Sequence, residues 1–273
     1  MTSLNQVRAV VTGGGGGLGR AIARALARRG GRVLVADVNL EGAEATAKLV
    51  EAGGGRAHAR RADVSVYDDV ARLAEEAERL WGGTDLLVNN AGVGIGGPLD
   101  AIPIDDWKWA VGVNFWGPVY GCQVFVPGFK RQGGGHILNV ASAAGLLAAP
   151  EMAPYNATKA AVVALSETLH AELAPHKVGV TVLCPTFFQT DIVKSGRLHS
   201  SDGAAIANKL MSRAKLQADD VARLALEGVE ADRLYVVPHP DGRWMWRLKR
   251  LAPEPFYHRL LPRIGGIRGR VAR

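Results

Sequence analysis

The chain has 273 residues, of which 48% are hydrophobic and 22% charged, a composition typical of a folded α/β protein. This composition excludes a disordered chain and a fibre. The formal net charge is +7, but residues 243–273 hold nine Arg or Lys residues and one acid, so that segment alone carries +8. The remaining residues carry −1, which argues against nucleic-acid binding by the body of the protein.

The chain contains two cysteines, Cys122 and Cys184, in apolar runs without metal-ligand or CxxC spacing. This placement indicates buried thiols in a reducing compartment. The seven histidines show no paired ligand spacing, so we expect no metal site. The N-terminal residues lack the features of a signal peptide, and no run reaches the roughly 18 apolar residues of a membrane helix. We therefore expect a soluble, cytoplasmic protein.

Short runs rich in Val, Leu and Ile alternate along the chain with helix-like stretches. The strand-like runs span residues 7–13, 32–38, 85–92, 135–142, 179–185 and 233–239, with a weaker candidate at 55–64. Continuous apolar strands are typical of a parallel sheet that is covered on both faces. The sequence predicts an α/β fold, a Rossmann-type doubly wound parallel sheet in three α/β/α layers. Residues 1–242 would form this single domain, and 243–273 a basic amphipathic C-terminal extension.

Five consecutive glycines, at positions 13–17, join the first strand-like run to an amphipathic helix. A helix N-terminus preceded by bare backbone can bind a pyrophosphate through its free N–H groups. The pattern is TGxxxGxG, and a mononucleotide P-loop is disfavoured because no GK[ST] follows. We predict a dinucleotide site in this turn, with cofactor contacts from Gly13, Gly16, Gly17, Leu18 and Gly19.

Asp37 ends the second strand-like run, eighteen residues after Gly19. A carboxylate at this spacing accepts hydrogen bonds from the adenosine ribose and repels a 2′-phosphate. Positions 16, 38 and 39 carry no Lys or Arg, although Arg20 or Arg60 could fold across the site. The sequence therefore predicts NAD(H), with NADP(H) less favoured.

Tyr155 and Lys159 are separated by four residues in a helix-like stretch that begins with Pro154. Their phenol and ammonium groups would lie on one helix face. A nearby ammonium favours the phenolate, so Tyr155 can act as a general acid or base.

Residues 7 to about 240 resemble the short-chain dehydrogenase/reductase family. The resemblance rests on TGGGGGLG at 12–19, NNAG at 89–92, YNATK at 155–159 and PTFFQT at 185–190, together with Asn114 and Ser142. One departure stands out, because the family commonly has Pro-Gly where this chain has Pro185 and Thr186.

The resemblance implies a role for each matching residue. Ser142 would hydrogen-bond the substrate oxygen, Tyr155 would transfer its proton, Lys159 would hold the nicotinamide ribose and lower the tyrosine pKa, and Asn114 would support a water relay. Further cofactor contacts would come from Asp63, Val64, Asn90, Ala91, Gly92, Pro185 and Thr190. The family also implies a homodimer or homotetramer.

The residues expected to line the substrate pocket are mostly apolar, namely Ile95, Ala144, Met152, Phe187 and Phe188. An apolar secondary alcohol or ketone (alicyclic, aromatic, steroid-like or fatty) fits such a wall best. We predict an NAD-dependent alcohol dehydrogenase or carbonyl reductase. The alternative is a protein that senses NAD(H), or serves as a scaffold, without turnover.

The C-terminal extension places Trp244, Leu248 and Leu251 at helical spacing, with arginines nearby. Three interpretations compete. The segment could dock across a subunit interface or over the active site, bind peripherally to an anionic membrane, or, least favoured, bind nucleic acid.

Overall fold

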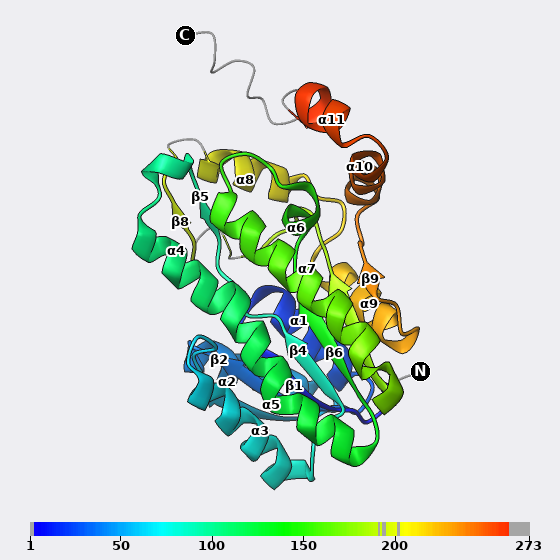
Figure 1. Ribbon diagram of the computed structural model, residues 1–273. Helices are drawn as coiled ribbons and strands as arrows, with labels where there is room; N and C mark the ends of the chain where they lie inside the picture. The colour runs from blue at the N-terminus through cyan, green and yellow to red at the C-terminus, as the bar shows by residue number, and fades with distance from the viewer. Residues whose placement is uncertain (1–2, 191, 193–194, 201–202, 262–273) are drawn as a thin grey trace.

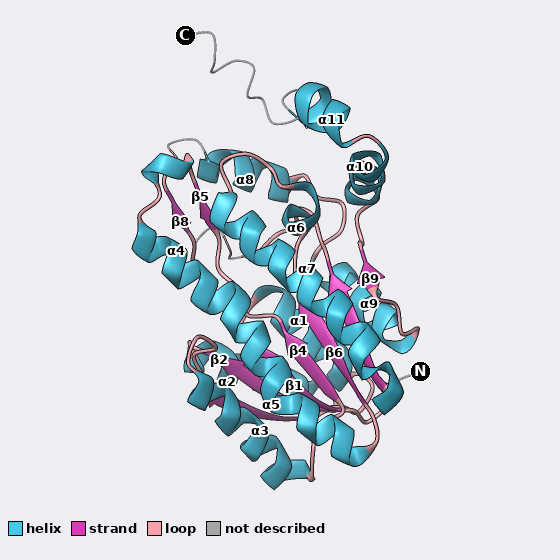
Figure 2. Cartoon of the chain, in the orientation of Figure 1, coloured by secondary structure: helices cyan, strands magenta, loops and turns pink. Residues whose placement is uncertain are grey.

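The computed structural model describes residues 3–190, 192, 195–200 and 203–261, and within these ranges seven parallel strands form one sheet (Figures 1 and 2). The order of the strands is β3-β2-β1-β4-β6-β7-β9. Their bounds are β1 Arg8–Thr12, β2 Arg32–Asp37, β3 Arg56–Arg61, β4 Leu86–Asn89, β6 Gly135–Val140, β7 Val178–Leu183 and β9 Tyr235–Val236. Each adjacent pair is parallel. The order runs outward in opposite directions from the β1–β4 junction, as in a doubly wound sheet, so the predicted fold class is confirmed.

The helices follow the strands in the expected alternation. The main helices are α1 Gly17–Ala27, α2 Leu40–Ala52, α3 Tyr67–Trp81, α4 Ile104–Val111, α5 Gly117–Gln132, α6 Ala143–Leu147, α7 Ala153–Leu173, α8 Gly203–Ser212, α9 Ala218–Glu230 and α10 Pro240–Leu251. Short helical turns occupy η1 Leu99–Ala101, η2 Gly112–Trp116, η3 Ala174–His176, α11 Pro253–Pro255 and η4 Phe256–Leu260.

The sheet lies between two layers of helices. Because successive strand residues face opposite ways, Ala9 and Val11 of β1 pack on the side of α1, α2 and α9. Val10 between them packs on the side of α3, α5 and α7. The three layers position the carboxyl ends of β1, β4, β6 and β7 along one edge of the sheet, where a doubly wound fold binds its ligands.

The predicted strands are all present, although several are shorter than the sequence suggested. The run at 85–92 leaves the sheet after Asn89, and the run at 233–239 pairs only over Tyr235 and Val236. A separate pair of short strands, β5 Ile95–Gly96 and β8 Arg197–Leu198, lies beside α4 and α8 (Figure 2). Both cysteines are buried and unpaired, and no helix in the described ranges could cross a membrane.

Candidate active site

The ends of β1 and β4 are joined by the hydroxyl of Thr12. This hydroxyl accepts hydrogen bonds from the backbone N–H groups of Asn90 (3.1 Å) and Ala91 (3.2 Å). In return, the side-chain amide of Asn90 donates to the carbonyls of Thr12 (2.9 Å) and Gly13 (3.0 Å). These contacts bring the predicted cofactor residues Asn90 and Ala91 directly against the glycine turn.

The glycine turn is packed too closely for side chains. A Cβ atom on Gly19 would lie 2.3 Å from the carbonyl oxygen of Gly13, and Gly13 itself has a φ of 61°. Gly16 is the N-cap of α1 and makes no side-chain capping bond, so the first N–H groups of that helix face the turn without a protein cap. Bare backbone and an uncapped helix N-terminus fit the diphosphate of a dinucleotide.

Asp37 lies against this turn at the end of β2. Its carboxylate accepts hydrogen bonds from the N–H of Gly15 (2.8 Å) and from the N–H of Asn39 (2.9 Å). Arg20 reaches the same turn from α1, where its guanidinium bonds the Gly15 carbonyl and the hydroxyl of Thr46. Arg61, rather than Arg60, is the neighbour of Asp37 in register on β3.

Two of the predicted cofactor residues, Asp63 and Val64, follow the end of β3. The carboxylate of Asp63 accepts hydrogen bonds from the N–H (2.9 Å) and hydroxyl (2.7 Å) of Ser65, which shapes the turn after the strand. Val64 is buried against Gly117, where a Cβ would lie 2.9 Å from a Val64 methyl group.

The side chains of the predicted catalytic set come from three elements: η2, the start of α6, and α7. Tyr155 and Lys159 lie on α7, and the Nζ of Lys159 is 5.7 Å from the centroid of the Tyr155 ring. Lys159 donates to the carbonyl of Val140 at the end of β6, 2.9 Å away. Gly92 is close to both Lys159 and Asn114, because a Cβ at this glycine would lie 3.3 Å from Nζ and 3.2 Å from the Asn114 Oδ1.

Asn114 occupies η2, a single π-helical turn between α4 and α5. It is fully buried, accepts a hydrogen bond from the N–H of Val93 (2.8 Å) and donates to the Val93 carbonyl (2.9 Å). The side-chain amide also lies 3.4 Å from the hydroxyl of Thr158. Asn114 therefore holds the segment after β4 against the helix that carries Tyr155.

Ser142 is the N-cap of α6. Its hydroxyl accepts a hydrogen bond from the N–H of Ala144 (3.1 Å) and donates to the carbonyl of Pro185 (3.4 Å). Burial raises the pKa of Tyr155 to about 12, while a hydrogen bond with Ser142 acts in the opposite direction. Burial also lowers the pKa of Lys159 to about 8. Burial therefore raises the pKa of the phenol, opposite to the effect that a nearby ammonium is expected to have.

An apolar cluster surrounds Tyr155. It contains the predicted pocket residues Ile95, Ala144 and Met152, and also Ile102, Trp107, Trp109, Ala110 and Ile192. The other two predicted pocket residues lie elsewhere. Phe188 is buried in the core beside α1 and α9, and the Phe187 side chain is 42% exposed.

The segment around β8 is tied to this cluster through α4. The carboxylate of Asp106 binds Arg197 (2.5 Å) and His199 (2.7 Å), and the guanidinium of Arg197 lies 4.1 Å from the Trp109 ring centroid. The nearby arginine and histidine lower the pKa of Asp106, which keeps it charged. Lys194 and Asp191, in the same segment of the sequence, lie outside the described residues.

The comparisons with known proteins agree with this arrangement. A family model described as short chain dehydrogenase matches residues 7–200. The chain belongs to the short-chain dehydrogenase/reductase family of NAD(P)-dependent oxidoreductases. A crystal structure of a member of this family from Burkholderia phymatum in complex with NAD is similar at 36% identity and a TM-score of 0.88, covering 93% of this chain and 96% of that one.

Two curated relatives are similar along most of their length. A C alpha-dehydrogenase from Sphingobium is 31% identical over 247 residues, which cover 86% of this chain and 81% of the relative. A 1-deoxy-11-beta-hydroxypentalenate dehydrogenase from Streptomyces exfoliatus is 33% identical over 257 residues, covering 93% of this chain and 90% of the relative.

The PTFFQT loop, residues 185–190, is held at both ends. The carbonyl of Pro185 accepts from the N–H of Ala143 (2.8 Å), next to Ser142. The hydroxyl of Thr190, at the other end of the loop, contacts the sulfur of Met211 on α8.

Several residues at the site have roles that were not predicted from the sequence. Thr12 and Thr158 make the bonds described above, and the two tryptophans of α4 reach the apolar cluster. The DDWKWAV run carried a usable signal, since two tryptophans beside acidic residues are unusual on a solvated helix. Among the described residues, no three His, Cys, Asp or Glu side chains gather as a metal site would require.

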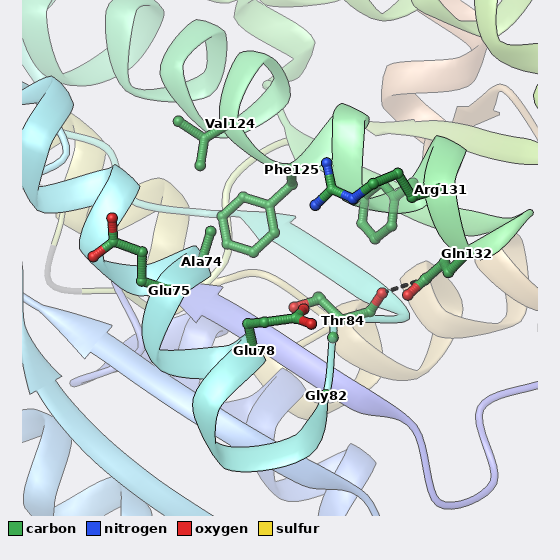
Figure 3. A pocket seen from close by; sticks show the side chains of 12 residues that line it. Ala74, Glu75, Glu78, Gly82, Thr84, Val124, Phe125, Arg131 and Gln132 are labelled. Atoms are coloured by element: carbon green, nitrogen blue, oxygen red, sulfur yellow. Dashed lines mark hydrogen bonds between the residues drawn. The ribbon is translucent and has the colours of Figure 1, made fainter.

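A hollow of about 420 Å³ lies between α3 and α5, away from these residues (Figure 3). Glu75 and Glu78 line one side, Phe125 and Arg131 the other, and Gln132 bonds the carbonyl of Thr84. Thr84 precedes β4, so the hollow is at the amino ends of the strands. No predicted site residue lines this hollow. We therefore place the site at the carboxyl ends of the strands, around Ser142, Tyr155 and Lys159.

The described part of the C-terminal extension packs on its own chain beside α6 (Figure 1). Met245, Trp246 and Leu248 face the core, while Trp244 is 57% and Leu251 85% exposed. The expected stripe of Trp244, Leu248 and Leu251 is therefore divided between two faces of α10. The interpretations as a membrane, subunit or nucleic-acid contact stay predictions, as does the division of the chain at residue 242.

Proposed function

We propose that the protein transfers a hydride between NAD(H) and an apolar secondary alcohol or ketone, with Tyr155 as general acid and base. The observation that carries this proposal is the position of the Tyr155 phenol, which touches Ser142 and lies inside an apolar cluster. A phenol of this kind can exchange a proton with a substrate oxygen while the surrounding side chains exclude water.

In alcohol oxidation, the Ser142 hydroxyl donates a hydrogen bond to the substrate oxygen and orients the reacting carbon. The Tyr155 oxygen accepts the hydroxyl proton. Lys159 binds the nicotinamide ribose, and its positive charge favours the phenolate. Bound NAD⁺ supplies the hydride acceptor. In the reverse direction the phenol returns the proton to the developing alkoxide.

The preference for NAD over NADP rests on Asp37. Its carboxylate lies at the glycine turn, where it would accept hydrogen bonds from the ribose hydroxyls and repel a 2′-phosphate. Arg20 is bonded to the Gly15 carbonyl and the Thr46 hydroxyl, which orient its guanidinium but leave its positive charge in place. Arg20 at the turn and Arg61, beside Asp37 on β3, are therefore the basic residues that compete with this assignment.

The choice of an apolar substrate rests on the cluster around Tyr155, with two tryptophans and four side chains of Ile or Met. The names of the two relatives describe dehydrogenases, and the second of them acts on a hydroxypentalenate. The two buried thiols support the reducing cytoplasm that we propose as the location.

A sensor or scaffold that binds NAD(H) without turnover is the competing function. Wild type and Tyr155→Phe should be compared for NADH binding by fluorescence and for oxidation of a panel of alicyclic, aromatic, steroid and fatty alcohols. We expect the variant to bind NADH and lose turnover, whereas Tyr67→Phe on the exposed start of α3 should behave as wild type. Binding without turnover in wild type would favour the sensor, and turnover of polar sugars alone would overturn the substrate class.

A further inference from the structure

The loop that follows β7 is clamped by the start of α10. The N–H of Thr186 donates a hydrogen bond to the Nδ1 of His239, 3.2 Å away. Two residues further along, the Phe188 ring stacks on the imidazole, with centroids 6.3 Å apart and planes at 26°. One histidine therefore fixes two positions in a loop whose first residue, Pro185, is bonded to the Ser142 segment.

The imidazole is buried, with 6% of its surface exposed, and its Nε2 has no hydrogen-bond partner among the described residues. Burial lowers the pKa of His239, with Asp241 acting against this and Arg243 with it. The neutral ring can accept the Thr186 N–H only at an unprotonated Nδ1, which places its own proton on Nε2. The fold thus tolerates one unpaired buried N–H in order to keep this acceptor in place.

His239 is itself held firmly. The guanidinium of Arg243 donates to the carbonyls of Val237 and Pro238, each 2.8 Å away, which fixes the backbone immediately before the histidine. At the other end of α10, Lys249 donates to the carbonyl of Leu146 on α6 (2.6 Å). Through His239 before its start and Lys249 near its end, the helix is tied to the loop that begins at Pro185 and to α6.

The departure from the family pattern at Thr186 is accommodated by this same helix. A Cβ on Gly242 would lie 2.7 Å from the Thr186 methyl group, closer than side chains pack. The threonine can stand in the position usually held by glycine because the first turn of α10 presents a buried glycine to it. Thr186 and Gly242 form a matched pair across the contact.

We propose that His239 is a positioning residue that holds the Pro185–Thr190 loop against the nicotinamide half of the cofactor, with Gly242 providing the space for Thr186. This inference rests on the proposed function, because the loop reaches the nicotinamide only if hydride transfer takes place beside Ser142, which bonds the Pro185 carbonyl. The adenosine half is bound by the glycine turn on β1 and α1, which His239 does not touch.

Binding of two ligands separates this role from a general effect on folding. NADH uses both halves of the site, whereas ADP-ribose lacks the nicotinamide and uses only the adenosine and diphosphate contacts. We expect His239→Ala to weaken NADH binding and raise the KM for NAD by about tenfold, from the loss of one hydrogen bond and one ring stack. The affinity for ADP-ribose should stay within about twofold of wild type.

Substitutions that replace one ring nitrogen of His239 with an amide group test which nitrogen holds the loop. An asparagine carbonyl can occupy the place of Nδ1, while a glutamine amide reaches the place of Nε2. His239→Asn should therefore recover most of the NADH affinity and His239→Gln should not. His170→Ala is the matched control, since the Nδ1 of His170 likewise makes one hydrogen bond to the backbone, at the Val180 carbonyl, but on the far part of α7.

A second pair of variants tests the packing. Gly242→Ala should weaken NADH binding selectively, and adding Thr186→Ala, which removes the opposing methyl group, should restore it. Equal losses for NADH and ADP-ribose in His239→Ala, or no loss for either, would overturn the positioning role. Failure of wild type to bind NADH would instead refute the proposed function.

Discussion

Gly145 is the point at which the helix beginning at Ser142 meets the helix that carries the catalytic pair. A Cβ at Gly145 would lie 2.5 Å from the Lys159 carbonyl carbon and 2.6 Å from its oxygen, both backbone atoms. Ordinary contact begins at 3.4 Å, so Gly145→Ala forces α6 and α7 apart by about 0.9 Å. Since Ser142 is the N-cap of α6, we expect its hydroxyl to move away from the Tyr155 phenol by a similar amount.

A misplacement of about 1 Å lowers the rate of an aligned reaction by about 100-fold. We expect kcat for alcohol oxidation to fall by that factor in Gly145→Ala, with NADH affinity nearly unchanged because the glycine turn is not involved. Overpacking should also cost about 1–3 kcal/mol of unfolding free energy, or roughly 2–12 °C in Tm.

Gly128→Ala in α5 is the control, because the nearest atom to its Cβ would be the flexible end of Arg131 at 3.9 Å. That variant should keep full activity and gain up to about 1 kcal/mol from helix propensity. If Gly145→Ala has kcat within threefold of wild type and an unchanged Tm, the close contact between α6 and α7 does not set the catalytic geometry.

Three further outcomes test separate parts of the site. The rate of alcohol oxidation should rise about tenfold per pH unit below the pKa of the catalytic phenol. Lys159→Met removes a cation that stabilises the phenolate, so this rise should move to higher pH. An unchanged pH profile would contradict the role of the ammonium. Asp37→Ser should shift the ratio of kcat/KM values toward NADP(H) by about tenfold, because a like charge near the 2′-phosphate is removed, and steady-state kinetics with both cofactors would detect the lack of a shift. Asp106→Asn should release Arg197 and His199 and raise the substrate KM severalfold without changing NADH affinity, so equal changes in both constants would count against a local role.

The parallel sheet and the order of its elements could be predicted because apolar runs and amphipathic helices are local patterns. The ends of the strands could not. The run that includes Asn90 reads as strand, yet it leaves the sheet where its backbone donates to the hydroxyl of Thr12, 78 positions earlier. Such contacts depend on the folded arrangement and leave no periodic signal in either segment.

In the candidate site, too, local contacts could be predicted from the sequence and contacts between distant segments could not. Tyr155 and Lys159 share a helix face, so their proximity follows from spacing alone. The loop containing Phe188 was expected to line the pocket because of its apolar residues, but the structure directs this ring to the core and to His239. The orientation of α10 about its axis was also unpredictable, since Lys249 bonds the carbonyl of Leu146, 103 positions earlier in the chain.

The outer face of α10 exposes Trp244 and Leu251 beside Arg247 and Arg250, while the inner face holds the loop through His239. Because His239 bonds this loop, a displacement of α10 would also displace the loop. Under the proposed role of His239, a ligand that binds the outer face and shifts the helix would change cofactor affinity, and by reciprocity the cofactor would change the affinity for that ligand by the same factor. The proposal thus predicts a thermodynamic coupling between the exposed face of α10 and the nicotinamide.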